Sequence, residues 1–259
     1  GLGDVYKRQL AYSLNNQLGF MVVGIGIGTE MALNGTASHA FAHILYKALL
    51  FMSVGAVLFR TGTSKASELG GLYRTMPLTA IFCLVGAASI SAFPLFSGFV
   101  TKSLIMDQAA NQHYEFIWFV LVFASAGVLS HSGIKVPFFA FFSHDSGLRP
   151  KEAPKHMLLA MGITSALCIV IGIAPVILYE YLPYEVNYKP YTSYHVINQL
   201  QLLCFAILSF ILIKWFKMLP KEIRAINIDS DIFYRKALPI SLTLLMHDFV
   251  SVDGYGVSP

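Results

Sequence analysis

Long apolar runs recur along the chain, and polar residues gather between them. Each run is continuously apolar, without the alternate polar positions of a membrane β-strand. Each also reaches roughly the 20 residues that an α-helix needs to cross about 30 Å of hydrocarbon. The pattern therefore predicts an all-α, polytopic transmembrane helical bundle of about six spans. The spans are expected at residues 10–28, 38–59, 76–106, 115–133, 157–180 and 196–216.

The overall composition supports this prediction. The chain is 56% hydrophobic and 12% charged, with a mean hydropathy of +0.62, whereas roughly a quarter of the residues in soluble domains are charged. One soluble core could not cover so many apolar runs, so we expect a multi-pass protein of the cell inner (plasma) membrane. The three cysteines, Cys83, Cys168 and Cys204, stand singly in different runs, and their spacing indicates packing residues rather than a metal site.

The basic residues alternate between the two sides of the predicted bundle. Fifteen of the 18 Lys and Arg residues fall on one side when Lys214 is counted with the tail, and only Lys189 falls on the other. The remaining two, Lys47 and Lys102, lie inside spans. Because short cytoplasmic loops are enriched in basic residues, both ends of the chain are predicted to be cytoplasmic. Topology then explains the net charge of +4, and nucleic-acid binding is not expected.

Three parts of the chain differ in composition. Residues 1–9 contain neither an initiator Met nor an apolar core, and we expect them to be an uncertain or artefactual N-terminus. Residues 10–218 hold all six predicted spans. Residues 219–259 are polar and then apolar over too short a run to span comfortably. They are predicted to be a cytoplasmic or interfacial tail, or the start of a further span.

The second span carries three ionisable residues. His39, His43 and Lys47 are spaced i, i+4, i+8, so a helix places them in one stripe that climbs roughly 12 Å. Such a stripe suits a proton relay, because histidine titrates nearest to neutral pH and ionisable residues inside membranes are usually functional. The alternatives are interhelical hydrogen bonds by the histidines and a lysine that snorkels to the membrane surface.

The His39 and His43 pair also has the spacing of a helical metal site. A closed metal site usually has three or four ligands, and a protonated Lys47 in the same stripe would repel a cation. The central parts of the other spans offer no acidic residue to complete the site. Neither a metal nor a cofactor is therefore expected.

The third span is predicted to contain a broken helix at Pro94, Ser97 and Gly98. Proline removes a helical hydrogen bond, and glycine permits dihedral angles that other residues resist. Discontinuous helices of this kind surround transporter sites near the membrane midplane. Lys102 follows the break. If it lies in the first turn of the second half-helix, desolvation and the helix dipole both disfavour its ammonium form, which makes it a candidate proton carrier.

The fourth span ends with His131 and Lys135, four residues apart. Their position near the predicted cytoplasmic end fits two roles equally. They could mark the exit of a channel, or they could anchor the span at the membrane interface.

Several blocks of sequence, in this order, resemble the antiporter-like proton-channel family. The family includes the D component of Mrp-type multisubunit Na+/H+ antiporters and the proton-pumping membrane subunits of respiratory complex I. The blocks are "KRQLAYSLNNQLGFMVVGIGIG", "SHAFAHILYKALLFMSVGAVLF", "ELGGLYRTMPLT" and "SISAFPLFSGFVTKSLI", with weaker similarity in "HSGIKVPFFAFF" and "DSGLRPKEAP".

The resemblance implies a fold and a set of roles. Family members contain two inverted repeats, each with a broken helix and a half-channel, and this chain is similar to the second repeat. The resemblance implies that His39 and His43 lie on a water-filled central axis. It also implies that Lys47 matches a motif lysine there, and that Lys102 matches the lysine of the broken helix.

These observations predict a C-terminal fragment of a proton-conducting antiporter subunit. It would relay protons through Lys102, His39, His43 and Lys47, and would be a transporter subunit rather than an enzyme. The expected partners are other membrane subunits, protons, Na+ or another monovalent cation, and the lipid bilayer. The alternative is a proton-translocating membrane subunit of NADH-quinone oxidoreductase or of a membrane hydrogenase. A membrane metalloenzyme and an inert structural remnant are further alternatives.

Overall fold

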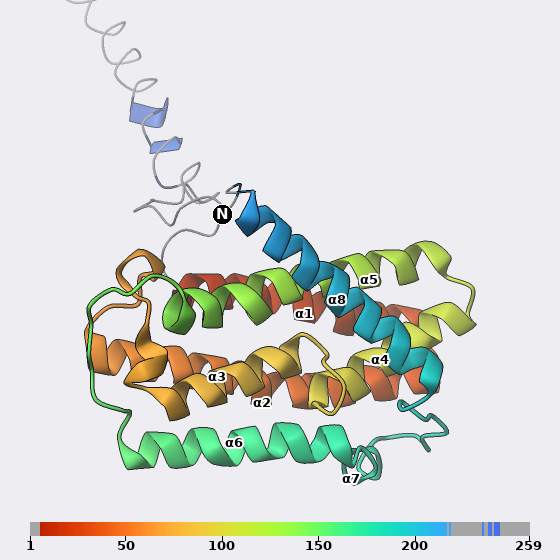
Figure 1. The fold of residues 1–259 in the computed structure, drawn as a ribbon. Coiled ribbons are helices and arrows are strands. Elements are labelled where there is room, and N and C mark those ends of the chain that lie inside the picture. Colours follow the sequence, from red (N-terminus) through yellow and green to blue (C-terminus); the bar gives the residue numbers. More distant parts are fainter. Residues whose placement is uncertain (1–5, 217, 219–234, 236–237, 240, 244–259) are drawn as a thin grey trace, which may run out of the picture. The chain divides into compact units, whose positions relative to one another are not determined.

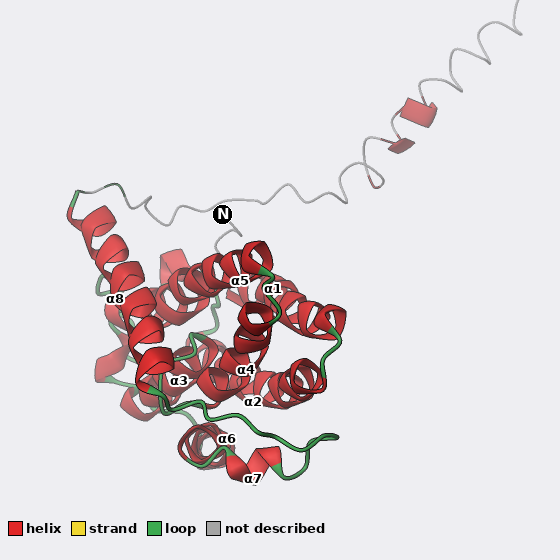
Figure 2. Cartoon of the chain, turned by 90° about the vertical axis from the view of Figure 1, so that its right-hand side faces the viewer, coloured by secondary structure: helices red, strands yellow, loops and turns green. Residues whose placement is uncertain are grey.

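The structure is a computed structural model that describes residues 6–216, 218, 235, 238–239 and 241–243. Within these residues every regular element is helical (Figures 1 and 2), which confirms the predicted all-α membrane bundle. The long helices are α1 (Tyr6–Ile27), α2 (Glu30–Thr61), α3 (Pro77–Ile90), α4 (Ser97–Asn111), α5 (Glu115–Val128), α6 (Lys155–Ile173) and α8 (Ser193–Trp215). The short ones are η1 (Ala66–Glu68), η2 (Leu72–Arg74), η3 (Leu129–Lys135), η4 (Phe138–Phe142) and α7 (Val176–Tyr179).

Among the described residues, each predicted span falls on a helix or on two consecutive helices. Four segments are long and apolar enough to cross a membrane by themselves: α2, the continuous segment Glu115–Phe142, α6 and α8. Helix α1 has 22 residues, which is also a sufficient length. Helices α3 and α4 have 14 and 15 residues, so each is too short alone and together they form the broken third span.

Several predicted span ends differ from the structure. The second span was expected to begin at residue 38, but α2 begins at Glu30, and the third was expected to end at residue 106, but α4 ends at Asn111. The fifth span was expected to reach residue 180, but α6 ends at Ile173, because Pro175 disfavours helix at the preceding residue. The fourth span was expected to end at residue 133, but it continues through the π-helical turns η3 and η4 to Phe142. Apolar periodicity does not distinguish these wider turns from α-helix, so no pattern in the chain marked them.

Helix α2 is the central element of the bundle. It packs against α1, α3, α4 and α6, and the end-on view in Figure 2 shows these helices around it. Its buried apolar side chains, including Tyr46, Leu50 and Val54, belong to the main core cluster. By contrast, only Leu203 of α8 is buried, and α8 crosses the surface of the bundle obliquely (Figure 1). Side chains on α2 therefore face protein on most sides, and those on α8 mostly face the surroundings.

Local capping fixes the two ends of α2. The Thr29 hydroxyl accepts a hydrogen bond from the Ala32 N–H (3.2 Å), which satisfies one of the free N–H groups of the first turn. Gly62 ends the helix with a left-handed φ of 76°, and its N–H donates to the Leu58 carbonyl. The caps hold α2 as one uninterrupted helix of 32 residues.

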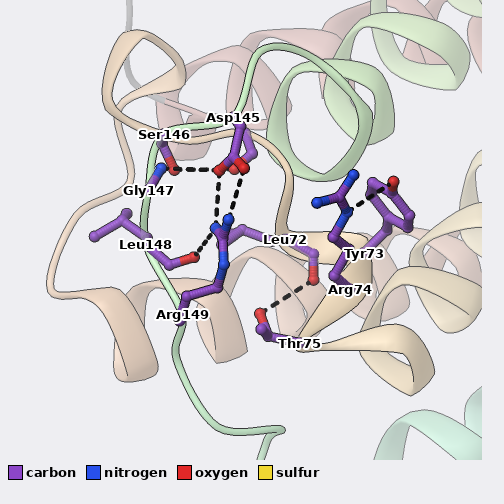
Figure 3. A network of polar contacts seen from close by, with 10 residues as sticks. Leu72, Tyr73, Arg74, Thr75, Asp145, Ser146, Gly147, Leu148 and Arg149 are labelled. Atoms are coloured by element: carbon purple, nitrogen blue, oxygen red, sulfur yellow. Dashed lines mark hydrogen bonds and ion pairs between the residues drawn. The ribbon is translucent and has the colours of Figure 1, made fainter.

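At one end of the bundle, the loop before α6 is bound to the start of α3. The Glu152 carboxylate accepts hydrogen bonds from the Leu78 N–H (2.8 Å) and the Thr79 hydroxyl (2.6 Å). The Ser146 hydroxyl donates to the Gly70 carbonyl (2.9 Å). Figure 3 shows the exposed ion pair of Asp145 with Arg149 in the same loop. We call residues 143–152, with these contacts, the loop clamp.

The described residues 6–216 and 218 belong to one compact unit, and residues 235, 238–239 and 241–243 belong to a second. The predicted tail at 219–259 lies outside the described residues apart from 235, 238–239 and 241–243. Residues 1–5 of the predicted uncertain N-terminus also lie outside them.

Candidate functional site

The three ionisable residues of α2 are buried inside the bundle. His39 is fully buried, and His43 and Lys47 are 7% and 3% exposed. The two imidazole rings are stacked with centroids 6.4 Å apart, as expected for residues one helical turn apart on one face. The side chains therefore point into protein, and Lys47 does not snorkel to the surface.

Lys47 binds α1. Its ammonium nitrogen donates to the Leu10 carbonyl (3.2 Å) and to the Ser13 hydroxyl. The Ser132 hydroxyl, on the π-helical turn η3, also donates to Ser13 (3.0 Å). Ser13 thus connects Lys47 to the fourth span, and the partners of this buried lysine are neutral oxygens.

The third span breaks where the sequence predicted. Helix α3 ends at Ile90 and α4 begins at Ser97, and Pro94 lies in the turn between them. Ala92 and Leu95 have positive φ values of 56° and 74°, which non-glycine residues rarely adopt and which cluster at functional sites. A Cβ atom on Gly98 would overlap the Ser89 carbonyl oxygen, so only glycine lets the two half-helices approach this closely.

Lys102 reaches back across the break. Its side chain is 1% exposed, and its nitrogen donates to the Ile90 carbonyl at 2.7 Å. The same nitrogen lies 5.2 Å from the centre of the Phe20 ring, a cation–π distance. Ile90 is the last residue of α3, so Lys102 contacts a free carbonyl at the negative end of that helix's dipole.

This contact corrects one expectation from the sequence. The sequence suggested that Lys102 lies in the first turn of the second half-helix, where the helix dipole would disfavour an ammonium ion. It is the sixth residue of α4, which places it in the second turn, and it binds the C-terminal end of α3 instead. The nearest helix end therefore favours the ammonium ion, while burial disfavours it.

A direct contact connects α2 to the broken helix. His39 Nδ1 lies 3.0 Å from the Thr101 hydroxyl, next to Lys102 in the sequence. On its other side, His39 Nε2 lies 3.5 Å from the Tyr46 hydroxyl, which donates to Gln17 of α1 (3.0 Å). His39 therefore connects the stripe on α2 to the broken helix through buried polar atoms, while Lys47 contacts Leu10 and Ser13 separately.

Sequence reasoning missed the neutral side chains that contact His39 directly or through Tyr46, and those around Lys47. They are Thr101, Tyr46 and Gln17 beside His39, and Ser13 and Ser132 beside Lys47. None of them is charged at neutral pH, so none stood out within an apolar run. One signal was present, because Ser13 and Gln17 are four residues apart and share a face of α1. Both are indeed buried.

His131 and Lys135 lie on η3. The Nε2 atom of His131 is buried without a hydrogen-bond partner among the described residues, and the Lys135 side chain is half-buried. Ser132, between them, is the residue that contacts Ser13, a partner of Lys47. A Cβ atom on Gly133 would overlap the Ser91 side chain, so η3 packs directly against the break in the third span.

The described residues contain no group of three or more His, Cys, Asp or Glu side chains placed to hold a metal ion. Both nitrogens of His39 face hydroxyl groups, on Thr101 and Tyr46. The arrangement is instead a row of groups that can gain, lose or pass a proton, with two buried lysines and two buried histidines within it.

Comparison with known proteins gives a consistent set of relatives. Residues 4–130 match the family model described as "NADH:quinone oxidoreductase/Mrp antiporter, TM". The chain is 32% identical over 180 residues to the D component of the Na(+)/H(+) antiporter of Alkalihalophilus pseudofirmus, covering 68% of this chain and 36% of that protein. It is 33% identical over 180 residues to the L component of the NADH-quinone oxidoreductase of Campylobacter jejuni, covering 68% and 29%.

Two solved structures share the fold. The Mrp complex from Dietzia sp. DQ12-45-1b superposes with a TM-score of 0.60 at 21% identity, covering 65% of this chain and 40% of that one. An archaeal membrane-bound sulfane sulfur reductase superposes with a TM-score of 0.65 at 22% identity, covering 98% and 47%. The chain thus spans less than half the length of the relatives it matches.

Proposed function

Because the chain belongs to the family of membrane subunits shared by NADH:quinone oxidoreductases and Mrp antiporters, we propose that it conducts protons in a monovalent cation (Na+)/H+ antiporter. The observation that carries the proposal is the buried contact of His39 with Thr101, beside Lys102. This contact joins the ionisable stripe of α2 to the broken helix.

The geometry supports a mechanism of alternating protonation. Lys102 holds a proton while the Ile90 carbonyl and the Phe20 ring stabilise the ammonium ion. The proton then passes through water and the Thr101 hydroxyl to His39, whose neutral ring has one donor and one acceptor nitrogen. Tyr46 and His43 continue the row to Lys47. Since the described residues place no carboxylate on either lysine, protonation of one disfavours protonation of the other through their mutual repulsion.

Buried atoms along this row support a hydrated path. The Nε2 atom of His43 and the hydroxyl oxygen of Ser91 are buried and have no hydrogen-bond partner among the described residues. Buried polar atoms in proteins are nearly always paired, often with water. Water at these positions would close the intervals between the side chains.

The setting of the proposed activity is a multisubunit membrane complex. Relatives of the chain are subunits of such complexes, and we infer that other membrane subunits, protons, Na+ or another monovalent cation, and lipid are its partners. From the distribution of the basic residues we propose that both ends of this fragment and the loop clamp face the cytoplasm. The chain then acts as a transporter subunit rather than as an enzyme.

A second candidate function rests on the relatives that belong to redox complexes. These include the L component of the NADH-quinone oxidoreductase and hydrogenase-4 component B of Escherichia coli, which is 29% identical over 191 residues. In that case the same proton path would be driven by electron transfer. Identification of the subunits that co-purify with the full-length protein distinguishes the two functions.

The test of the proposal is Lys102→Ala in the full-length gene product, assayed in inverted membrane vesicles. We expect Na+-dependent dissipation of a pH gradient to be lost in this variant. Lys151→Ala is the matched control, because Lys151 is an exposed lysine in the loop before α6. Antiport at the wild-type rate in Lys102→Ala would contradict the proposed role.

A further inference from the structure

A cavity of about 420 Å³ lies between α4, α5 and α8, separate from the network around His39. A volume above about 300 Å³ is large enough for several water molecules or a small ligand. Its walls are mostly apolar, and its charged and hydrogen-bonding side chains come mainly from α4 and α8. The lining includes Phe99, Ser103, Asp107, Trp118, His195 and Gln199.

Asp107 and His195 stand at one end of this cavity. The same two residues also line a second, more open pocket formed with residues 186–192. Asp107 Oδ1 lies 3.4 Å from His195 Nε2, and both side chains are 20% exposed. The pair therefore lies between the inner cavity and the outer pocket, where a group that exchanges protons can reach both.

The His195 ring also contacts the outer loop. Its Nδ1 atom lies 3.3 Å from the Tyr188 hydroxyl, so Tyr188, His195 and Asp107 form a row. The first turn of α8 holds the ring in place, because the His195 N–H donates to the Thr192 hydroxyl (3.2 Å). One imidazole nitrogen thus faces the outer pocket, and the other faces the carboxylate.

One wall of the cavity is linked to the broken helix. Gln199, which lines the cavity, donates from Nε2 to the Ser91 carbonyl (3.3 Å). Ser91 follows Ile90, whose carbonyl binds Lys102. Gln199 therefore connects the cavity wall to the residue next to the one that binds the Lys102 ammonium ion.

We propose that Asp107 and His195 form a proton-exchange site that connects this cavity with the solution at the α4–α8 end of the bundle. The predicted topology makes this the extracytoplasmic end. The inference rests on the proposed function, which it extends by a route between Lys102 and the outer solution. The Tyr188 hydroxyl passes its proton to His195 Nδ1 and is reprotonated by water in the outer pocket, while His195 releases its Nε2 proton to the Asp107 carboxylate. Asp107 then passes that proton to water in the cavity.

The surroundings favour a proton over a metal cation at this site. The imidazole of His195 already occupies one face of the carboxylate, and Lys189 lines the outer pocket and would repel a cation. Tyr188 and Tyr194 are the other titratable groups beside the pair. Helix α5 contributes only Trp118 and Val122, which carry no charge.

The experiment measures transport in inverted vesicles that contain the full-length gene product in its complex. We expect Asp107→Asn and His195→Ala to lower the initial rate of proton transport about tenfold or more, since removing a positioned proton carrier has at least that effect. His113→Asn and Glu115→Gln are the matched controls. Both residues are exposed near the same end and line neither pocket, so we expect rates within about twofold of the wild type.

Chemical rescue separates proton exchange from a structural role. His195→Ala leaves space for a free imidazole, so added imidazole should restore transport in this variant, whereas His195→Gln fills the space and should not respond. Native electrophoresis reports whether each variant assembles. Wild-type transport in Asp107→Asn and His195→Ala, or loss without rescue in an assembled His195→Ala complex, would overturn the proposal.

Lys102→Ala, measured in parallel, keeps this inference distinct from the proposed function. Loss of transport in Lys102→Ala with wild-type transport in the His195 and Asp107 variants rejects the outer exchange site alone. Unchanged transport in Lys102→Ala rejects the relay, whatever the other variants show.

Discussion

Two positively charged side chains, Lys102 and Arg149, differ in their burial and in the groups that they contact. Lys102 is buried and its nitrogen contacts a backbone carbonyl and an aromatic ring. Arg149, in the loop clamp, is exposed and makes two hydrogen bonds to the Asp145 carboxylate, at 2.8 and 2.6 Å (Figure 3). A carboxylate fixes a positive charge in place, whereas neutral oxygens leave the lysine able to release its proton. The comparison separates a buried lysine with neutral partners, which the proposed relay uses, from an exposed ion pair within a single loop.

The largest effect is expected from a change that closes the broken helix. In Gly98→Ala the new Cβ overlaps the Ser89 carbonyl oxygen, and the half-helices must separate. We expect a loss of about 3 kcal/mol or more in stability and little assembled protein. Gly127→Ala is the control, because nothing lies within 4 Å of a Cβ there. Thermal unfolding in detergent measures the stability of both variants. Equal unfolding midpoints would contradict the close approach of α3 and α4 at Gly98.

An intermediate effect is expected from removing one hydroxyl between the two helices. Thr101→Val keeps the shape of the side chain but removes the contact with His39 Nδ1 (3.0 Å). We expect proton transport to fall about tenfold with normal assembly. Thr164→Val is the control, since the exposed Thr164 hydroxyl donates to the Ala160 carbonyl within α6. Equal transport rates in the two variants would show that the relay does not use Thr101.

The smallest effect is expected in the loop clamp. The Arg149 guanidinium and the Gly147 N–H hold the pKa of the exposed Asp145 carboxyl below its ordinary value. A lowered pKa stabilises the fold above the ordinary value of about 3.9, and this stabilisation is lost as the pH falls further. Asp145→Asn should therefore cost little stability at neutral pH, because exposed ion pairs contribute little.

The check is thermal unfolding of wild type and Asp145→Asn across this pH range. The difference between their midpoints should be small at pH 7 and should shrink as the pH falls below about 4, because the carboxyl of the unfolded chain takes up a proton there before the carboxyl of the folded protein does. A difference that grows as the pH falls would mean that Asp145 destabilises the loop clamp.

The sequence predicted those features that depend on neighbours along the chain. Apolar length set the number of spans, and Pro94 with Gly98 predicted the break between Ile90 and Ser97. The i, i+4, i+8 spacing predicted the shared stripe of His39 and Lys47. In each case one element determines the result, so no knowledge of packing between helices was required.

The remaining features depend on contacts between elements distant in sequence. Thr101 is an ordinary polar residue until α4 packs against α2 and brings it to His39. The contact of Lys102 with Ile90 depends on how the half-helices meet, which the sequence alone did not specify. Likewise, Asp107 and His195 are 88 positions apart in the sequence, and their pairing arises only from the path of α8.

The most direct measurement of the central claim is Na+-driven proton transport by Lys102→Arg in the full-length protein reconstituted into liposomes. A guanidinium keeps the positive charge but does not release its proton in proteins. We predict that transport falls about a hundredfold, while Arg149→Lys, the reverse exchange in the loop clamp, transports at the wild-type rate. Wild-type transport by Lys102→Arg would contradict the account, because a fixed charge would then suffice at the broken helix.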